Sequence, residues 1–150
     1  MKKKNYEIRT IRDGDFTEWK DLFEKYLKFY ETSVTHDVFK KTFERLTNSE
    51  KKNQNGLVAQ KDSKLIGLAH FIYHPHNWKV EDVCYLQDLF VEEKFRGLGV
   101  AYSLMTSIYS EADKHKTPTV YWLTQDFNIR ARKLYDRVGA KTAFIRYNRA

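Results

Sequence analysis

A basic segment with two glycines stands between a predicted buried strand and a predicted helix, and its residue types suit phosphate binding. It reads Lys94-Phe95-Arg96-Gly97-Leu98-Gly99-Val100-Ala101. The first amides of a helix have no partners inside the helix, and the helix dipole adds about half a positive charge at that end. Glycines let an oxyanion approach the backbone because they carry no side chain. The stretch from Arg96 to Ala101 is therefore predicted to hold a pyrophosphate group.

Two other phosphate-binding patterns do not fit this segment. A P-loop requires Gly-x-x-x-x-Gly-Lys-Ser/Thr, and the sequence contains no such run. A dinucleotide-binding fingerprint requires a further glycine, but Ser103 and Leu104 occupy that neighbourhood. An ordinary strand-turn-helix with two incidental glycines is the remaining alternative.

Thiol and metal chemistry are less well supported by the sequence. Cys84 lies within an apolar strand pattern, where thiols are usually inert. His70, His74 and His76 are spaced unlike a zinc-binding set, and no second cysteine accompanies them. We therefore expect no metal site, and we expect His70 to be a packed strand residue.

Hydrophobic spacing predicts the elements that must position these residues. Helical periodicity covers 19–30, 38–46, 98–115 and 129–138, and Gly139 ends the last helix. Strand patterns cover 6–12, 56–59, 64–73, 83–91, 119–124 and 142–147. Strands flank helices in the second half, which predicts a parallel pair, while the first half supplies antiparallel strands. We expect one α/β domain over residues 1–150, with a mixed, mostly antiparallel central sheet and flanking helices.

Composition narrows the class of protein. The 150 residues are 41% hydrophobic and 15% aromatic, which suits a globular domain and excludes a disordered chain. One cysteine and the absence of an apolar leader after Lys4 predict a cytoplasmic protein, and no apolar run is long enough for a membrane span. The net charge of +7 favours an anionic partner. A nucleic-acid-binding domain is an alternative, but we expect no nucleic-acid partner because no basic face with interleaved aromatics is evident.

Three blocks of the second half resemble the GNAT superfamily of N-acetyltransferases. Arg96 to Ala101 is similar to that family's Gln/Arg-x-x-Gly-x-Gly/Ala segment, which binds the pyrophosphate of acetyl-CoA. Tyr85 to Val91 is similar to its fourth strand, and Asn128 to Ala140 to its Asn-x-x-Ala-x-x-x-Tyr segment. Within the family, the pattern is most similar to the polyamine and histone acetyltransferase branches. The resemblance implies the GNAT fold and an acetyl transfer from acetyl-CoA to a primary amine.

The resemblance also implies roles for single residues in binding the co-substrate and in proton transfer. Backbone groups of Leu89, Phe90 and Val91 would meet the thioester and the pantetheine arm, and Asn128 would bond to the same arm. Tyr135 matches the position of the proton donor to the departing sulfur. Alternatively, Tyr135 is a core residue and Asn128 a plain helix cap.

The proton acceptor is where the sequence departs from the polyamine branch. Gln87 stands where that branch has a glutamate, and an amide is no base near neutral pH. Asp88 follows it, but adjacent residues of a regular strand face opposite sides of the sheet. We therefore expect that Asp88 does not simply replace position 87, and both residues stay catalytic candidates beside Tyr135.

The acceptor site is predicted from the first helices and from a loop. Tyr30 and Glu31 offer an aromatic surface with a carboxylate, which suits a cationic amine, and His74 and Trp78 are expected near its mouth. The expected acceptor is a small cationic amine, such as a polyamine or an amino acid. A protein lysine, a peptide N-terminus, or binding of acyl-CoA without turnover are the alternatives. A homodimer is possible through an edge strand at 144–147.

Overall fold

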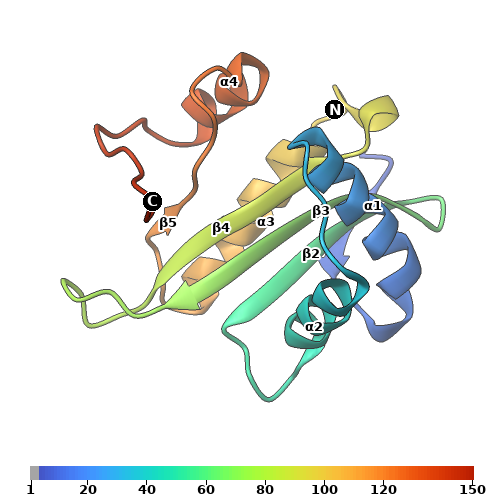
Figure 1. Cartoon of the computed structure of the whole chain (residues 1–150), viewed down its shortest axis with the longest axis horizontal. Helices are drawn as coiled ribbons and strands as arrows, with labels where there is room; N and C mark the ends of the chain where they lie inside the picture. The colour runs from blue at the N-terminus through green and yellow to red at the C-terminus, as the bar shows by residue number, and fades with distance from the viewer. Residues whose placement is uncertain (1–3) are drawn as a thin grey trace.

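The computed structural model describes residues 4–150 and contains a five-stranded sheet in the order β1-β2-β3-β4-β5 (Figure 1). Neighbouring strands are antiparallel except for β4 and β5, which are parallel. The strands are β1 (Glu7–Thr10), β2 (Gln54–Lys61), β3 (Lys64–His74), β4 (Val83–Val91) and β5 (Val120–Tyr121). The helices are α1 (Phe16–Phe29), α2 (His36–Thr47), α3 (Val100–Lys114) and α4 (Ile129–Val138), with short 3-10 turns η1 (Asp13–Asp15) and η2 (Glu93–Phe95). The predicted mixed sheet and its parallel pair are confirmed.

The sheet separates two hydrophobic cores. Helices α1 and α2 cover one face and α3 covers the other, as Figure 1 shows. Alternate residues of β2 divide between the two cores: Val58 packs with α1 and α2, while Leu57 and Ala59 pack with α3. Because both faces are covered, the central strands read as nearly continuous apolar runs.

Helix α1 presents an aromatic face to the first core. Trp19 and Phe23 are buried and pack against Phe39 and Phe43 of α2. The turn before α1 is held from β1, where Arg9 forms an ion pair of 2.7 Å with Asp15. This ion pair holds the pKa of Asp15 below its usual value, mainly through the Arg9 hydrogen bond. Among residues 4–150 no side chain caps α1, and the Asp15 carboxylate instead pairs with Arg9 of β1.

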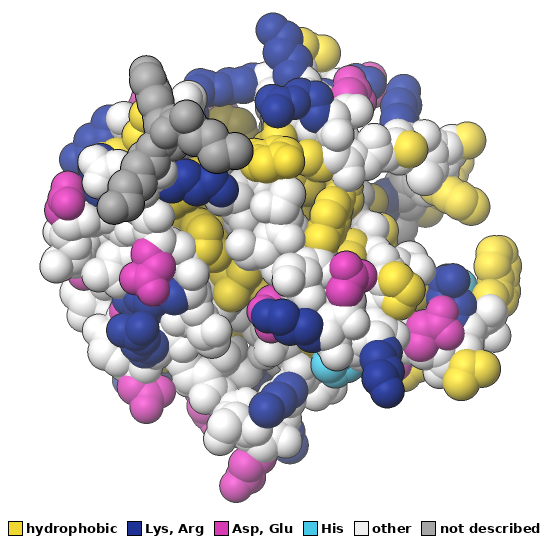
Figure 2. All heavy atoms as spheres, turned by 180° about the vertical axis from the view of Figure 1, so that it is seen from behind, with side chains coloured by type: hydrophobic (Ala, Val, Ile, Leu, Met, Phe, Trp, Pro, Cys, Tyr) yellow, Lys and Arg dark blue, Asp and Glu magenta, His cyan; other side chains and the backbone are white. Residues whose placement is uncertain are grey.

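The end of the chain differs from the expectation. No strand forms within 142–147 among the residues that the structure describes, so the predicted sixth strand is wrong. Phe144 and Tyr147 are 88% and 86% exposed, and Ile145 is also exposed. A strand requires a neighbour to accept its backbone hydrogen bonds, and this segment has none here. Figure 2 shows hydrophobic side chains projecting along the edge of the molecule that carries this segment and the β3–β4 loop.

Helix α4 is held to the body by few contacts. It has no buried residue, but Leu134, Tyr135 and Val138 pack against the α3-side core. Gly139 ends α4 with an extended backbone, not with a left-handed one. A Cβ at this position would lie 2.5 Å from the Trp122 ring, so the close approach of that ring explains the glycine. No helix in residues 4–150 is long and apolar enough to cross a membrane.

Candidate active site

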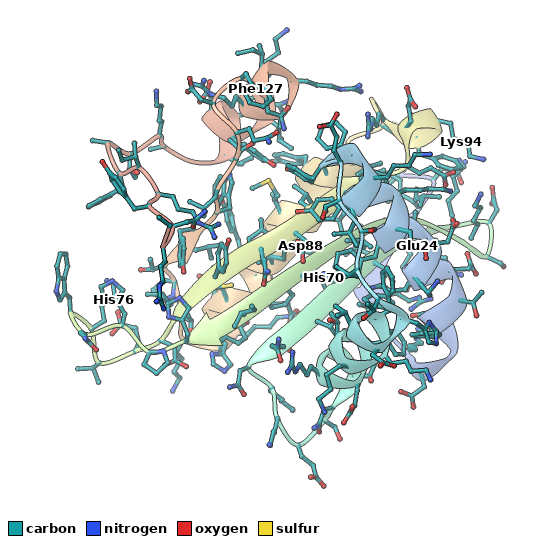
Figure 3. All side chains as sticks on the ribbon, viewed as in Figure 1. Glu24, His70, His76, Asp88, Lys94 and Phe127 are labelled. Carbon is teal, nitrogen blue, oxygen red and sulfur yellow. The ribbon has the colours of Figure 1, made fainter. Side chains whose placement is uncertain are left out.

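Strand β4 contains a bulge at Gln87. Across the β3–β4 pair, Asp88 lies opposite His70 and Leu86 lies opposite Phe71. Gln87 is therefore one extra residue in β4, without a partner on β3. The bulge lies near the middle of the sheet, where Figure 3 shows the Asp88 and His70 side chains close together.

The bulge changes which face of the sheet the following side chains reach. Leu86 and Leu89 both pack against the α3-side core, although a regular strand would place them on opposite faces. Asp88 instead bonds to His70 on the side of α1. Gln87 lies on that side too, since it lines a cavity together with two tyrosines of the α1 end. The expectation that Gln87 and Asp88 face opposite sides is wrong because it assumed a regular strand.

Two consecutive hydrogen bonds, from Trp19 to His70 and from His70 to Asp88, hold the Asp88 carboxylate in place. Trp19 Nε1 donates to His70 Nε2 over 2.8 Å, and His70 Nδ1 lies 2.8 Å from Asp88 Oδ2. His70 is buried, as predicted for a packed strand residue, whereas the Asp88 side chain keeps 14% of its surface exposed. One oxygen of the Asp88 carboxylate is therefore fixed by a hydrogen bond, and the side chain stays partly accessible.

A cavity lies next to this part of β4, between β4, the C-terminal end of α1 and α4. Its lining is mainly aromatic and amide: Tyr26, Tyr30, Leu86, Gln87, Leu89, Trp122, Leu123 and Tyr135. The predicted residues Tyr30, Gln87, Leu89 and Tyr135 thus come together from three distant parts of the sequence.

The phenols of this cavity are kept protonated. Burial raises the pKa of Tyr26, and the negative charge of Asp88 raises it further. The same two causes, in the same order, raise the pKa of Tyr30. For Tyr135, burial raises the pKa to about 12. Each phenol is therefore a hydrogen-bond donor at neutral pH, and none is a base.

Tyr135 is positioned by α4 and by an aromatic neighbour. Its ring meets Trp122 edge to face with centroids 5.6 Å apart, and it packs against the α3-side core. The Tyr109 hydroxyl, from α3, donates to the Val138 carbonyl over 2.7 Å and ties down the end of the same helix. Packing and catalysis are not exclusive for Tyr135, because the ring is partly buried while the residue lines the cavity.

One edge of β4 is open beside this cavity. Strand β5 pairs only with Cys84 and Tyr85 of β4. The chain then leaves the sheet toward α4, as Figure 1 shows. Among the described residues, no strand pairs with β4 from Leu86 onward on this side. The contact of the Leu89 to Val91 backbone with a pantetheine arm stays a prediction, and the Val91 carbonyl accepts from Arg96 Nε.

The turn before α3 has the conformation that anion binding requires. Gly97 and Gly99 have φ of 82° and 79°, a region that side chains other than glycine disfavour. Among residues 4–150 no side chain caps α3, so within this part of the chain the first amides after Gly99 have no such partner. A Cβ at Gly97 would meet nothing within 4 Å, which leaves the approach to the backbone open. The helix itself begins at Val100, not at Leu98.

The basic residues of this turn are already partly engaged. Arg96 Nε donates to the Val91 carbonyl over 3.1 Å, and the Arg96 guanidinium lies over the Phe90 ring. Lys94 lies 3.9 Å from Glu92. The backbone amides and the helix dipole, with Arg96 nearby, therefore form the part of the turn that fits a pyrophosphate.

Asn128 caps α4. Its side-chain oxygen accepts from the Ala131 amide at 3.4 Å, and its amide lies 3.5 Å from the Thr124 hydroxyl. The capping interpretation is confirmed, and the contact with a pantetheine arm stays a prediction.

Three predicted acceptor residues do not line the cavity. Glu31 is exposed after the end of α1, with φ of 55°. His74 bonds to the Tyr121 hydroxyl at 2.8 Å, and Trp78 is 87% exposed in the β3–β4 loop. Figure 3 shows His76, in the same loop, well away from Asp88. Their part in acceptor binding stays a prediction.

Sequence reasoning did not identify Tyr26, Trp122 and Trp19 as parts of the site. Tyr26 and Trp19 belong to the apolar face of α1, and their spacing indicated only packing. One property of the two residues could have indicated more than packing. The Tyr26 hydroxyl and the Trp19 indole N–H each need a hydrogen-bond partner when the residue is buried. Trp122 follows a very short strand, and nothing in its sequence context predicted a ring beside α4.

The remaining reactive groups are inert or absent from the site. Burial raises the pKa of the Cys84 thiol to about 12, so it is no nucleophile. No group of three metal-ligating side chains occurs within residues 4–150.

Comparisons with known proteins agree on one family. The model of the acetyltransferase (GNAT) family matches residues 19–140. The D-amino-acid N-acetyltransferase HPA3 of Saccharomyces cerevisiae is 36% identical over 95% of this chain and 89% of its own length. The L-ornithine N5-acetyltransferase NATA1 of Arabidopsis thaliana is 32% identical over 38% of this chain and 25% of its own length.

A solved structure shares the fold. The aminoglycoside acetyltransferase AAC(6')-Iy, in complex with a bisubstrate analogue of CoA, has a TM-score of 0.84, an identity of 18%, and 97% coverage of both chains. This likeness concerns the fold alone.

Proposed function

The chain belongs to the GNAT acetyltransferase family and is an acetyl-CoA-dependent N-acetyltransferase, and on that basis we propose that its acceptor is a small cationic amine. Polyamines and amino acids with a free amine are the compounds of this class that we place first. On the same basis we propose that the turn from Arg96 to Ala101 binds the pyrophosphate of acetyl-CoA.

The charge of the cavity is the observation that carries this proposal. None of the described residues that line it is a lysine or an arginine. The charge that acts on its phenols is that of the Asp88 carboxylate. An ammonium group is attracted by such a carboxylate and by aromatic faces. The cavity therefore favours cations although the whole chain carries a charge of +7.

The reaction assigns a step to each residue. The amine nitrogen attacks the thioester carbon of acetyl-CoA, the new C–N bond forms, and the C–S bond breaks as the intermediate collapses. Asp88 accepts the proton that the nitrogen loses, directly or through water, because Gln87 is unable to do so. Tyr135 donates a hydrogen bond, and then a proton, to the departing sulfur. Backbone amides of β4 between Leu89 and Val91 stabilise the oxyanion.

The curated relatives favour an amino acid within this class. HPA3 is named for D-amino acids and NATA1 for ornithine. An α-carboxylate needs a donor, and the described lining residues with side-chain donors are Gln87, the phenols and Trp122. We therefore place amino acids that carry a second amine, and polyamines, ahead of acidic or neutral amino acids. Protein lysine and non-catalytic acyl-CoA binding remain the alternatives.

Acetyl-CoA consumption over a panel of amines tests the proposal. The panel contains spermidine, D- and L-amino acids including ornithine, an aminoglycoside and a lysine peptide. We expect the highest kcat/KM for a small dibasic amine. A best substrate that is neutral or anionic apart from its reacting amine would contradict the electrostatic basis, and no turnover with any amine would favour a binding protein.

A further inference from the structure

Two consecutive hydrogen bonds connect α1 to the proposed proton acceptor through β3. Trp19 Nε1 donates to His70 Nε2 over 2.8 Å, and His70 Nδ1 lies 2.8 Å from Asp88 Oδ2. Trp19 is fully buried and His70 is nearly so. Of these three residues, only Asp88 takes part in the proposed reaction.

The chemistry of the indole decides where the proton of His70 lies. An indole N–H is a donor only, so His70 Nε2 must be the acceptor and carries no proton. The proton of the neutral imidazole is then on Nδ1, where it is donated to the Asp88 carboxylate. A second proton on Nε2 would set two N–H groups against each other.

We infer that Trp19 locks His70 in the neutral Nδ1–H form and that this lock both positions Asp88 and preserves it as a proton acceptor. The inference rests on the proposed role of Asp88. Trp19 and His70 are positioning residues, since both are buried and act only through Asp88. The arrangement reverses the order found in a serine hydrolase triad, where a carboxylate orients the histidine that acts as base.

Packing prevents the two rings from turning away from each other. The Trp19 ring lies 5.0 Å from Phe43 and 5.3 Å from Phe23, measured between centroids. Phe23 also meets the His70 ring edge to face at 5.0 Å. These neighbours are phenyl rings without a hydrogen-bonding nitrogen or oxygen, and their contacts hold both rings in place.

The charge of His70 decides how well Asp88 accepts a proton. A protonated imidazole at 2.8 Å would form an ion pair with the carboxylate and stabilise its ionised form strongly. A neutral imidazole instead gives one hydrogen bond and leaves the net charge of the carboxylate intact. The lock therefore fixes Oδ2 of Asp88 and leaves the other oxygen for the substrate amine. Asp88 follows Gln87 at the bulge and lies close to Tyr26, which lines the cavity: burial raises the pKa of that phenol, and the Asp88 charge raises it further.

Nitrogen NMR of the histidine rings in the intact protein tests the lock without any enzyme assay. The chain has five histidines. We expect the His70 signals to report a protonated Nδ1 and a bare Nε2. A His70 ring protonated on Nε2 would overturn the inference.

Replacement of the donor tests the catalytic consequence. Trp19→Phe removes the indole N–H, and Leu46→Ala is the matched control because it opens the same core at a residue outside the two hydrogen bonds. We expect Trp19→Phe to lower kcat roughly five- to ten-fold, the size expected for one hydrogen bond, with little change in KM for acetyl-CoA. An equal loss of kcat in Leu46→Ala, or full kcat in Trp19→Phe, would contradict the lock.

A pair of His70 variants separates positioning from packing. His70→Gln keeps one amide donor for Asp88 and one acceptor for Trp19, and neither takes up a proton, whereas His70→Met keeps similar volume without them. We expect Gln to retain several-fold more kcat than Met at similar stability. Full activity in Asp88→Asn would instead refute the proposed base while the NMR result stood, so the two failures are distinguishable.

Discussion

Removal of the Tyr135 hydroxyl is the most direct test of the chemistry. Tyr135→Phe keeps the ring that packs against Trp122 and the α3-side core. The change removes only the hydroxyl of a residue that lines the cavity, so the free energy of unfolding should change little. Any loss of turnover then reports on the reaction itself.

The raised pKa of Tyr135 sets the size of the expected effect. An unperturbed phenol and an alkyl thiol would be nearly balanced as acids, but burial raises the pKa of Tyr135 to about 12. Against a thiol of pKa about 8.5, complete proton transfer would be uphill by about 3.5 units, or about 5 kcal/mol. The same apolar cavity also desolvates the thiolate, which narrows this gap. Tyr135 should therefore act first as a hydrogen-bond donor to the developing negative charge.

A hydrogen bond to a charged group contributes about 1.5–3 kcal/mol, which corresponds to a loss of about 10- to 150-fold in kcat. Steady-state kinetics of Tyr135→Phe measure this loss, with acetyl-CoA affinity by calorimetry expected to stay nearly constant. Tyr109→Phe is the matched control, because it removes a hydroxyl that only ties α4 to α3. Full turnover in folded Tyr135→Phe, or an equal loss in both variants, would refute the role of Tyr135 as donor.

Three further predictions concern the base, the turn and the assembly. Asp88→Asn removes the proton acceptor without changing its shape, so kcat should fall about 100-fold or more while acetyl-CoA still binds, and retained turnover would exclude Asp88. Gly99→Glu places a carboxylate against phosphate and should abolish acetyl-CoA binding in calorimetry, whereas Gly99→Ala adds only the backbone strain at φ of 79° and should bind more weakly but measurably. Because apolar side chains at Phe144, Ile145 and Tyr147 are exposed, we propose a homodimer that deletion of 142–150 weakens, and light scattering of the full chain that shows only an 18.0 kDa species would reject it.

The sequence was informative where local rules act. The buried strand Val83–Val91, the glycine turn after it and the order of the helices follow from periodicity and from glycine chemistry. The family resemblance then supplied the co-substrate. These features depend on residues that are close together in the sequence, so hydrophobic spacing and glycine positions are enough to predict them.

The acceptor side of the site was beyond the same reasoning. A bulge adds one residue to β4 without any glycine or proline to mark it, and it reverses the alternation on which the faces of Gln87 and Asp88 were judged. The contact between Trp19 and His70 joins residues that are 51 positions apart, and no local pattern predicts it. The strand expected near the C-terminus failed for a related reason, because strand formation depends on a partner and not on propensity alone.

The open edge of β4 has a consequence for the behaviour of the purified protein. Unpaired strand edges act as templates for association with other chains. An extended ligand that pairs with this edge would cover it, and a ligand that binds only the folded state raises stability in proportion to the logarithm of its concentration. Acetyl-CoA would then serve as a removable strand of the sheet as well as an acetyl donor. Protein freed of CoA should therefore aggregate more readily and unfold at a lower temperature than protein stored with acetyl-CoA.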